Sequence, residues 1–177
     1  MNSVDVLRYG NRTLQQTIAG LEEADWTTGG VCGWWSVKDI IAHLASFEVV
    51  LVEVLTSFLH GGPTPTLEQY AQLDGNQFNE IQVGQRKDMT PAQVLAEYND
   101  QYARTMALVA QIPPDTLRRP GTLPWYGMEY SLDDFIVYAY YGHKREHSAQ
   151  IAVFRDLIRD KAGYGATQTT KLSSVPL

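Results

Sequence analysis

Apolar residues recur along much of this chain at steps of three, four and seven, which is the period of one face of an α-helix. The first such stretch runs from residue 4 to residue 21 and contains Val4, Leu7, Leu14, Ile18 and Leu21. A second begins at Ser36, which with Asp39 has the spacing of a capping box, and ends at Gly61-Gly62-Pro63. Its apolar positions are Ile40, Leu44, Phe47, Leu51, Leu55 and Phe58. These two patterns predict two helices.

The remaining chain predicts three more helical segments and two connections. A weaker pattern spans 66–83, and a well-marked helix starts at Thr90-Pro91 with Gln93 as the capping-box partner and ends at Pro113. Ser131 and Asp134 repeat the capping box before a last helix that ends at Gly163. Residues 22–35 and 113–130 lose the period and are rich in Gly, Pro or aromatic residues, which is typical of connections.

No stretch shows the alternation of apolar and polar residues that predicts a strand, so the fold class is all-α. Long helices with one apolar face each are most simply satisfied by a four-helix bundle, whose interior can hold a site built from facing side chains. The 177 residues correspond to one domain. We expect that domain to span residues 1–162 and residues 163–177 to form an irregular tail.

Composition narrows the class of protein. Hydrophobic residues make up 44% and charged residues 19%, the balance of a globular chain. The net charge of −6 argues against a nucleic-acid partner, which requires a basic surface. We find neither a signal-peptide core nor a run of about 18 apolar residues, so no membrane association is expected. The single cysteine, Cys32, fits a reducing cytoplasm.

Three histidines are the strongest candidates for chemistry. His143 and His147 are at i and i+4 on the apolar face of the last predicted helix, a spacing at which two rings can chelate one ion. His43 occupies the apolar face of the second helix. Several buried imidazoles destabilise a core unless their lone pairs are bound, and a divalent metal would bind them. Three nitrogen ligands with open positions resemble a catalytic rather than a structural site.

Other interpretations of these histidines stay open. Each can be a core histidine hydrogen-bonded to a neighbour, and His60 lies where the negative end of a helix dipole explains it. The string from His143 to His147 matches the H-x-x-E-H pattern of inverted zinc metalloproteases, but no Glu follows Glu146 to serve as their third ligand. Glu146 is the candidate catalytic residue, as a proton acceptor near the metal, or else a solvated side chain.

The aromatic connections have two interpretations. Trp34, Trp35, Trp125 and Tyr126 would suit the mouth of an apolar pocket, or they seal one end of the bundle. Cys32 is an alternative nucleophile, although no histidine lies near it in the sequence.

The chain resembles the DinB-like superfamily of bacterial four-helix-bundle proteins over nearly its whole length up to Ala162. The resemblance rests on three segments: residues 35–44 (WSVKDIIAHL), Phe78-Asn79 followed by Arg86 and Thr90-Pro91, and residues 143–147 (HKREH) followed by Gln150-Ile151. It implies an up-down-down-up bundle that forms a homodimer. It also implies a site for nickel, zinc or another divalent ion at His43, His143 and His147. Together with the aromatic loops, it gives Trp35, Asn79 and Trp125 as candidate pocket residues, Trp125 from the loop alone.

The resemblance further implies two functions. Some similar proteins are transferases or isomerases that use a low-molecular-weight thiol, such as mycothiol or bacillithiol, on a small-molecule substrate. Such a thiol loses its proton when it binds a metal, so no protein cysteine is needed as nucleophile. A hydrolase that uses a metal-bound water is the other enzyme that such a site would suit. A ClbS/DfsB-like sub-branch instead protects its producer by binding a reactive small molecule and need not use metal; Phe78, Asn79 and Arg86 are similar to that sub-branch. A dimerising scaffold without a ligand is the third possibility.

Overall fold

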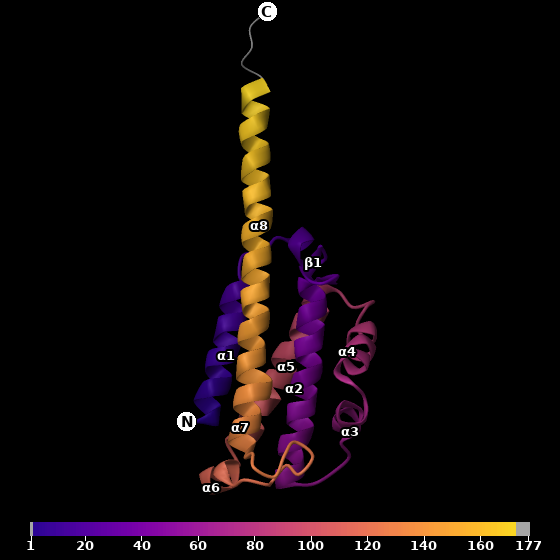
Figure 1. The fold of residues 1–177 in the computed structure, drawn as a ribbon, viewed down its shortest axis with the longest axis vertical. Helices are drawn as coiled ribbons and strands as arrows, with labels where there is room; N and C mark the ends of the chain where they lie inside the picture. Colours follow the sequence, from indigo (N-terminus) through magenta and orange to yellow (C-terminus); the bar gives the residue numbers. More distant parts are fainter. Residues whose placement is uncertain (1, 173–177) are drawn as a thin grey trace, which may run out of the picture.

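The computed structural model describes residues 2–172, and the side chains of residues 2–160 (Figure 1). Long helices dominate it, with one small hairpin. The elements are α1 (Ser3–Ile18), η1 (Glu23–Trp26), β1 (Gly29–Cys32), β2 (Trp35–Ser36), α2 (Val37–Leu59), α3 (Pro65–Gln72), α4 (Gly75–Gly84), α5 (Pro91–Val109), α6 (Pro114–Arg118), α7 (Leu132–Ile136), η2 (Val137–Gly142) and α8 (His143–Leu172).

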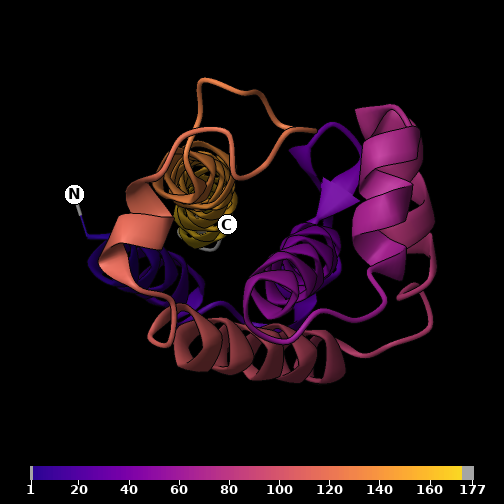
Figure 2. The same ribbon diagram turned by 90° about the horizontal axis from the view of Figure 1, so that it is seen from below.

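The fold is an up-down-down-up bundle, as the resemblance implied. In Figure 1, α1 and α8 run upward while α2 and α5 run downward. The segment α3–α4 carries the chain from the lower end of α2 back to the upper end of α5 and packs against the outside of α2 (Figure 2). The four long helices therefore enclose one core, and α2 has neighbours on most of its sides.

Three helix starts follow the capping boxes in the sequence. Ser36, Thr90 and Ser131 accept hydrogen bonds from the backbone N–H groups of Asp39, Gln93 and Asp134, and each of those three side chains bonds back to the cap residue. These reciprocal bonds satisfy N–H groups that a helix start otherwise leaves without partners. The starts of α2, α5 and α7 are confirmed for this reason.

The connections are more structured than expected. The segment 66–83 is two helices rather than one, because the Asp74 carboxylate accepts from the N–H groups of Asn76 and Gln77 and starts α4 afresh. The 22–35 connection contains η1 and an antiparallel hairpin of β1 and β2. The 113–130 loop contains the single-turn helix α6.

The last helical run differs from the expectation in two places. Between α7 and α8 the backbone is π-helical over the six residues of η2, which makes one wide turn just before His143. At the other end α8 continues to Leu172, beyond the boundary at residue 162. Residues 173–177 of the expected irregular tail lie outside the described residues.

The core has two apolar clusters along the bundle axis. Ile40, Ile41 and Leu44 of α2 belong to one, with Leu14, Tyr98 and Ile151. Leu51 and Leu55 belong to the other, with Leu7, Phe78 and Phe135. On α2 the buried residues Ser46 and Glu48 lie between the two clusters, so a polar layer crosses the centre of the bundle.

By length and composition alone, α2 is apolar enough to cross a membrane, but 72% of its most apolar window is buried inside the bundle. A helix surrounded by other helices is expected to be apolar on most sides. Its hydropathy is therefore explained by its place in the core.

Candidate metal centre

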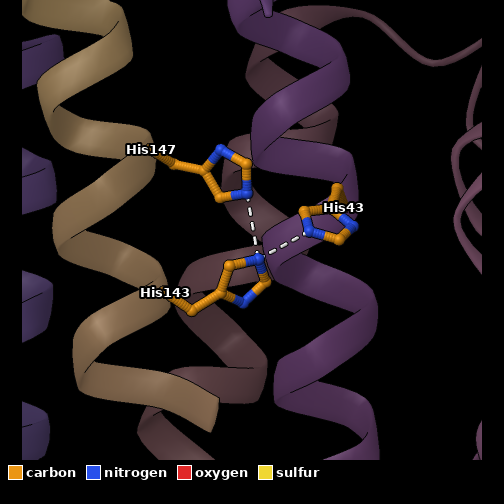
Figure 3. Close-up of side chains that lie close together, drawn as sticks. All are labelled: His43, His143 and His147. Carbon is orange, nitrogen blue, oxygen red and sulfur yellow. Dashed lines mark hydrogen bonds between the residues drawn. The ribbon is translucent and has the colours of Figure 1, made fainter. Parts of the chain in front are cut away.

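His43 of α2 faces His143 and His147 of α8 across the bundle (Figure 3). The Nε2 atom of His143 lies 2.7 Å from Nε2 of His43 and 2.9 Å from Nε2 of His147. One nitrogen from each ring lies within 4.8 Å of the other two, so the cluster could hold a metal ion. The structure thus brings together the three histidines that the sequence singled out.

The three rings are uncharged at neutral pH. Burial, and after it the neighbouring His143 and His147, lowers the pKa of His43 to about 2. Burial, and after it His147 and Lys144, lowers the pKa of His143 to about 3. The pKa of His147 is also lowered, chiefly by burial. A neutral imidazole carries one N–H and one lone pair, so the question is which nitrogen carries the proton.

An oxygen-bearing group lies beside each of the three rings. His147 Nδ1 lies 2.8 Å from Gln150 Oε1, and because a carbonyl oxygen only accepts, Nδ1 must donate. His143 is hydrogen-bonded to the backbone of Ala139, one helical turn earlier. The Asn79 side chain is a polar neighbour of His43, and His43 Nδ1 and Asn79 Oδ1 are both buried without a hydrogen-bond partner among the described residues. The contact with Gln150 places the proton of His147 on Nδ1, and a proton on Nδ1 of His43 and His143 would give those two rings the same arrangement.

With their protons on Nδ1, all three rings present bare lone pairs from Nε2. The two short Nε2 to Nε2 contacts then have no proton between them and would be repulsive. Two nitrogens that share one zinc-like ion at about 2.1 Å lie roughly 3.0–3.4 Å apart, close to the separations seen here. Oxygen acceptors on the outer nitrogens are also the usual support of metal-binding histidines. The donor set therefore fits a divalent transition metal.

The π-helical turn η2 helps to set this geometry. It ends at Gly142, directly before His143, and contains Ala139, the backbone partner of His143. A π-turn adds one residue to a helical turn and rotates the side chains that follow it, and such turns are frequent at functional sites. We conclude that η2 contributes to the direction in which His143 faces α2.

A cavity of about 530 Å³ opens beside the histidines. Its described lining comes from the hairpin, α2, α4 and α8: Cys32, Gly33, Trp34, Trp35, His43, Phe47, Asn76, Asn79, Glu80, His143, Glu146 and His147. The ring centre of Trp35 lies 5.1 Å from the ring centre of His43, and the ring centres of Phe47 and His143 are 4.6 Å apart. This size and mixture of aromatic and polar groups suit a small organic ligand.

The aromatic and polar residues that the sequence suggested for a pocket lie in two different parts of the structure. Trp35 and Asn79 line the cavity. Trp125 is not among its lining residues; its ring packs 5.3 Å from Phe135 and 6.4 Å from Tyr70. Tyr126 also packs on Phe135. The second aromatic loop therefore covers the end of the bundle, while the Trp34-Trp35 segment faces the histidines.

Two other candidates also line the cavity. Glu146 is exposed, which suits either a proton acceptor or a solvated side chain. Cys32 is partly buried on the hairpin and lines the same cavity, but it does not belong to the group of potential ligands formed by the histidines. Folding therefore brings Cys32 nearer to the histidines than its place in the sequence indicated.

A buried ion pair lies next to the histidines and was missed from the sequence. Lys144 of α8 pairs with Glu48 of α2. The second Glu48 oxygen accepts from the Thr105 hydroxyl of α5 at 2.8 Å. The one signal available was the presence of Glu48 within a strongly apolar helix.

Fold and site together define a helical bundle of the DinB-like class with a three-histidine cluster between α2 and α8. Residues 7–129 match the family described as the mycothiol maleylpyruvate isomerase N-terminal domain, which is part of the DinB-like superfamily. The chain belongs to this family. The matched region contains His43, whereas His143 and His147 lie beyond it. No curated protein and no solved structure matched the chain.

Proposed function

We propose that this protein is a metal-dependent enzyme that uses a low-molecular-weight thiol of the mycothiol type to transform a small electrophilic molecule, as a transferase or an isomerase. The observation that carries this proposal is the convergence of the Nε2 atoms of three buried histidines, one of which, His147, donates from Nδ1 to Gln150. Family membership supports the choice of thiol. The metal is nickel or zinc, both of which accept imidazole ligands.

Each part of the site has a role in this proposal. His43, His143 and His147 hold the ion. The ion, when bound, supplies the positive charge that stabilises a thiolate at neutral pH. Trp35 and Phe47 form apolar walls that keep water from the reacting groups. Glu146 accepts the thiol proton. The sulfur then bonds to the electrophilic carbon while, in an isomerase, a carbon–carbon π bond of the substrate opens and is re-formed when the thiol departs, or, in a transferase, the substrate's leaving group departs with the electron pair of the broken bond.

The first experiment measures metal content in protein purified without a histidine tag. We expect about one equivalent of nickel or zinc, and a sharp loss of affinity in each of His43→Ala, His143→Ala and His147→Ala. His60→Ala is the matched control, since His60 caps the far end of the same helix as His43 and is exposed. Full metal content in any one of the three variants would remove that residue from the ligand set.

The second experiment tests the thiol. A panel of small electrophiles is incubated with the metal-loaded protein and with mycothiol, bacillithiol or glutathione, and consumption of the electrophile is followed. Turnover that requires an added thiol and disappears in His143→Ala supports the proposal. A protein that binds no metal even after reconstitution, yet sequesters an electrophile stoichiometrically, would instead support the ClbS/DfsB-like alternative.

A further inference from the structure

The cavity beside the histidines has an unbalanced charge. Among the described residues that line it, two have acidic side chains, Glu80 of α4 and Glu146 of α8, and neither Lys nor Arg is present. Neither glutamate belongs to any of the ion pairs formed within the described chain. Both carboxylates are therefore available to a ligand.

The cations on the surrounding helices are engaged elsewhere. Lys144 of α8 is buried against Glu48. The guanidinium of Arg145 lies over the Tyr141 ring at 5.6 Å. Arg86, which follows α4, makes two bonds to the Glu97 carboxylate, at 2.7 and 2.9 Å. Lys38 of α2 donates to the backbone carbonyls of Lys87 and Met89. None of these four cations lines the cavity.

The aromatic residues of the lining also favour a cationic ligand over an anionic one. Trp34 and Trp35 lie side by side in the sequence, and the Trp34 side chain is 78% exposed. The face of an indole ring attracts cations through its negative potential and offers nothing to an anion. Carboxylates and indole rings together are a combination that recognises organic cations, whereas a cavity without a basic side chain leaves an anionic group unpaired.

We infer that this cavity selects aromatic ligands that are neutral or positively charged in the part that lies against the cavity walls, away from the histidines. It rejects ligands that carry a carboxylate in that part, including dicarboxylates. This inference rests on the proposed function only in taking the cavity as the substrate site. It narrows the substrate class from small electrophiles in general to neutral or cationic aromatic ones.

Three probes of nearly equal shape test the inference: tryptamine, tryptophol and indole-3-acetate, which are cationic, neutral and anionic. Binding to the full-length chain is measured by calorimetry at low salt, as purified and after removal of metal by a chelator. The measurement on metal-free protein decides between the outcomes, because the carboxylate of indole-3-acetate can otherwise bind the metal ion directly. We expect tryptamine to bind about tenfold more tightly than indole-3-acetate, with tryptophol between them.

Variants assign the selectivity to the two carboxylates. Glu80→Gln and Glu146→Gln should each weaken tryptamine binding about two- to fivefold and strengthen indole-3-acetate binding by a similar factor. Asp100→Asn, on α5 and outside the cavity lining, changes the net charge equally and should alter neither. Salt at 0.5 M should reduce the preference, since it screens exposed charges.

The inference is overturned if metal-free protein binds indole-3-acetate as tightly as tryptamine, or if neither glutamine variant changes the ratio of the two affinities. Failure of the proposed function gives a different result. The metal or the thiol reaction would then be absent while the order of the three probes persisted, because the probes require neither.

Discussion

Lys144 and Glu48 form an ion pair between α8 and α2 that is withdrawn from solvent, with side chains 2% and 0% exposed. Thr105 binds the same carboxylate, and the Lys144 ammonium lies 5.6 and 5.2 Å from the ring centres of Tyr98 and Tyr102 of α5. Three of the four long helices therefore meet at this pair. Lys144 directly follows His143, so the pair also fixes the place of α8 beside α2 near the histidines.

Removing one member of this pair should destabilise the fold strongly. Lys144→Met leaves the Glu48 carboxylate buried without its counter-charge and should lower the free energy of unfolding by about 3–5 kcal/mol. The double variant Glu48→Leu/Lys144→Met should recover most of that loss, because a buried apolar pair is an adequate replacement. Urea denaturation measures both. A double variant no more stable than the single one would contradict this account.

Asn79 should act on the metal through His43. Asn79→Ala removes the polar side chain beside His43, and loss of such an outer partner typically lowers metal affinity 10- to 100-fold. Gln150→Ala should do the same through His147. Competition with a chromophoric chelator gives the affinities. Asn76→Ala, which changes another amide of the cavity lining, is the control and should leave metal affinity unchanged.

The free energy of unfolding of the metal-free protein should decrease as the pH is lowered. The pKa values of His43 and His143 are lowered to about 2 and about 3 from 6.5, and that of His147 is lowered too. Below pH 6.5 the unfolded chain binds protons that the folded chain does not, so the histidines favour unfolding progressively as the pH falls. Thermal midpoints between pH 7.5 and 5 in the presence of a chelator measure this. The triple His→Gln variant should show a flatter profile; an equally steep one would assign the effect to other groups.

Activity should not depend on Cys32. If the nucleophile is a small thiol held at the histidine site, Cys32→Ala retains at least about half of the turnover while His143→Ala loses it. This comparison is informative because both residues line the same cavity. Activity that disappears in Cys32→Ala and survives in His143→Ala would show that the cysteine is the nucleophile.

Duplex DNA should not bind at physiological salt. The net charge is −6, and the basic residues of α8 whose side chains are described are interrupted by acids or engaged within the fold. Non-specific DNA binding requires cations that displace counterions from the phosphates. Fluorescence polarisation with a labelled duplex is the measurement, and a tight signal that falls steeply with added salt would refute the prediction.

The sequence by itself determined the helices that have strong local signals. Ser36 with Asp39, Thr90 with Gln93 and Ser131 with Asp134 mark starts that the structure reproduces, because a capping box involves residues only three apart. The periodic placement of His43, His143 and His147 on apolar faces also identified the cluster, because a helical period fixes which face a side chain occupies.

Only the tertiary structure decided which groups meet across the bundle. Asn79 faces His43, Lys144 is buried on Glu48, and Glu80 lines the same cavity as Glu146, although these partners are far apart along the chain. The apolar period of the sequence likewise does not predict the π-turn before His143. Sequence periodicity records the direction of each side chain around its own helix. It carries no information on the register between two helices, and that register is set by packing and by buried polar pairs.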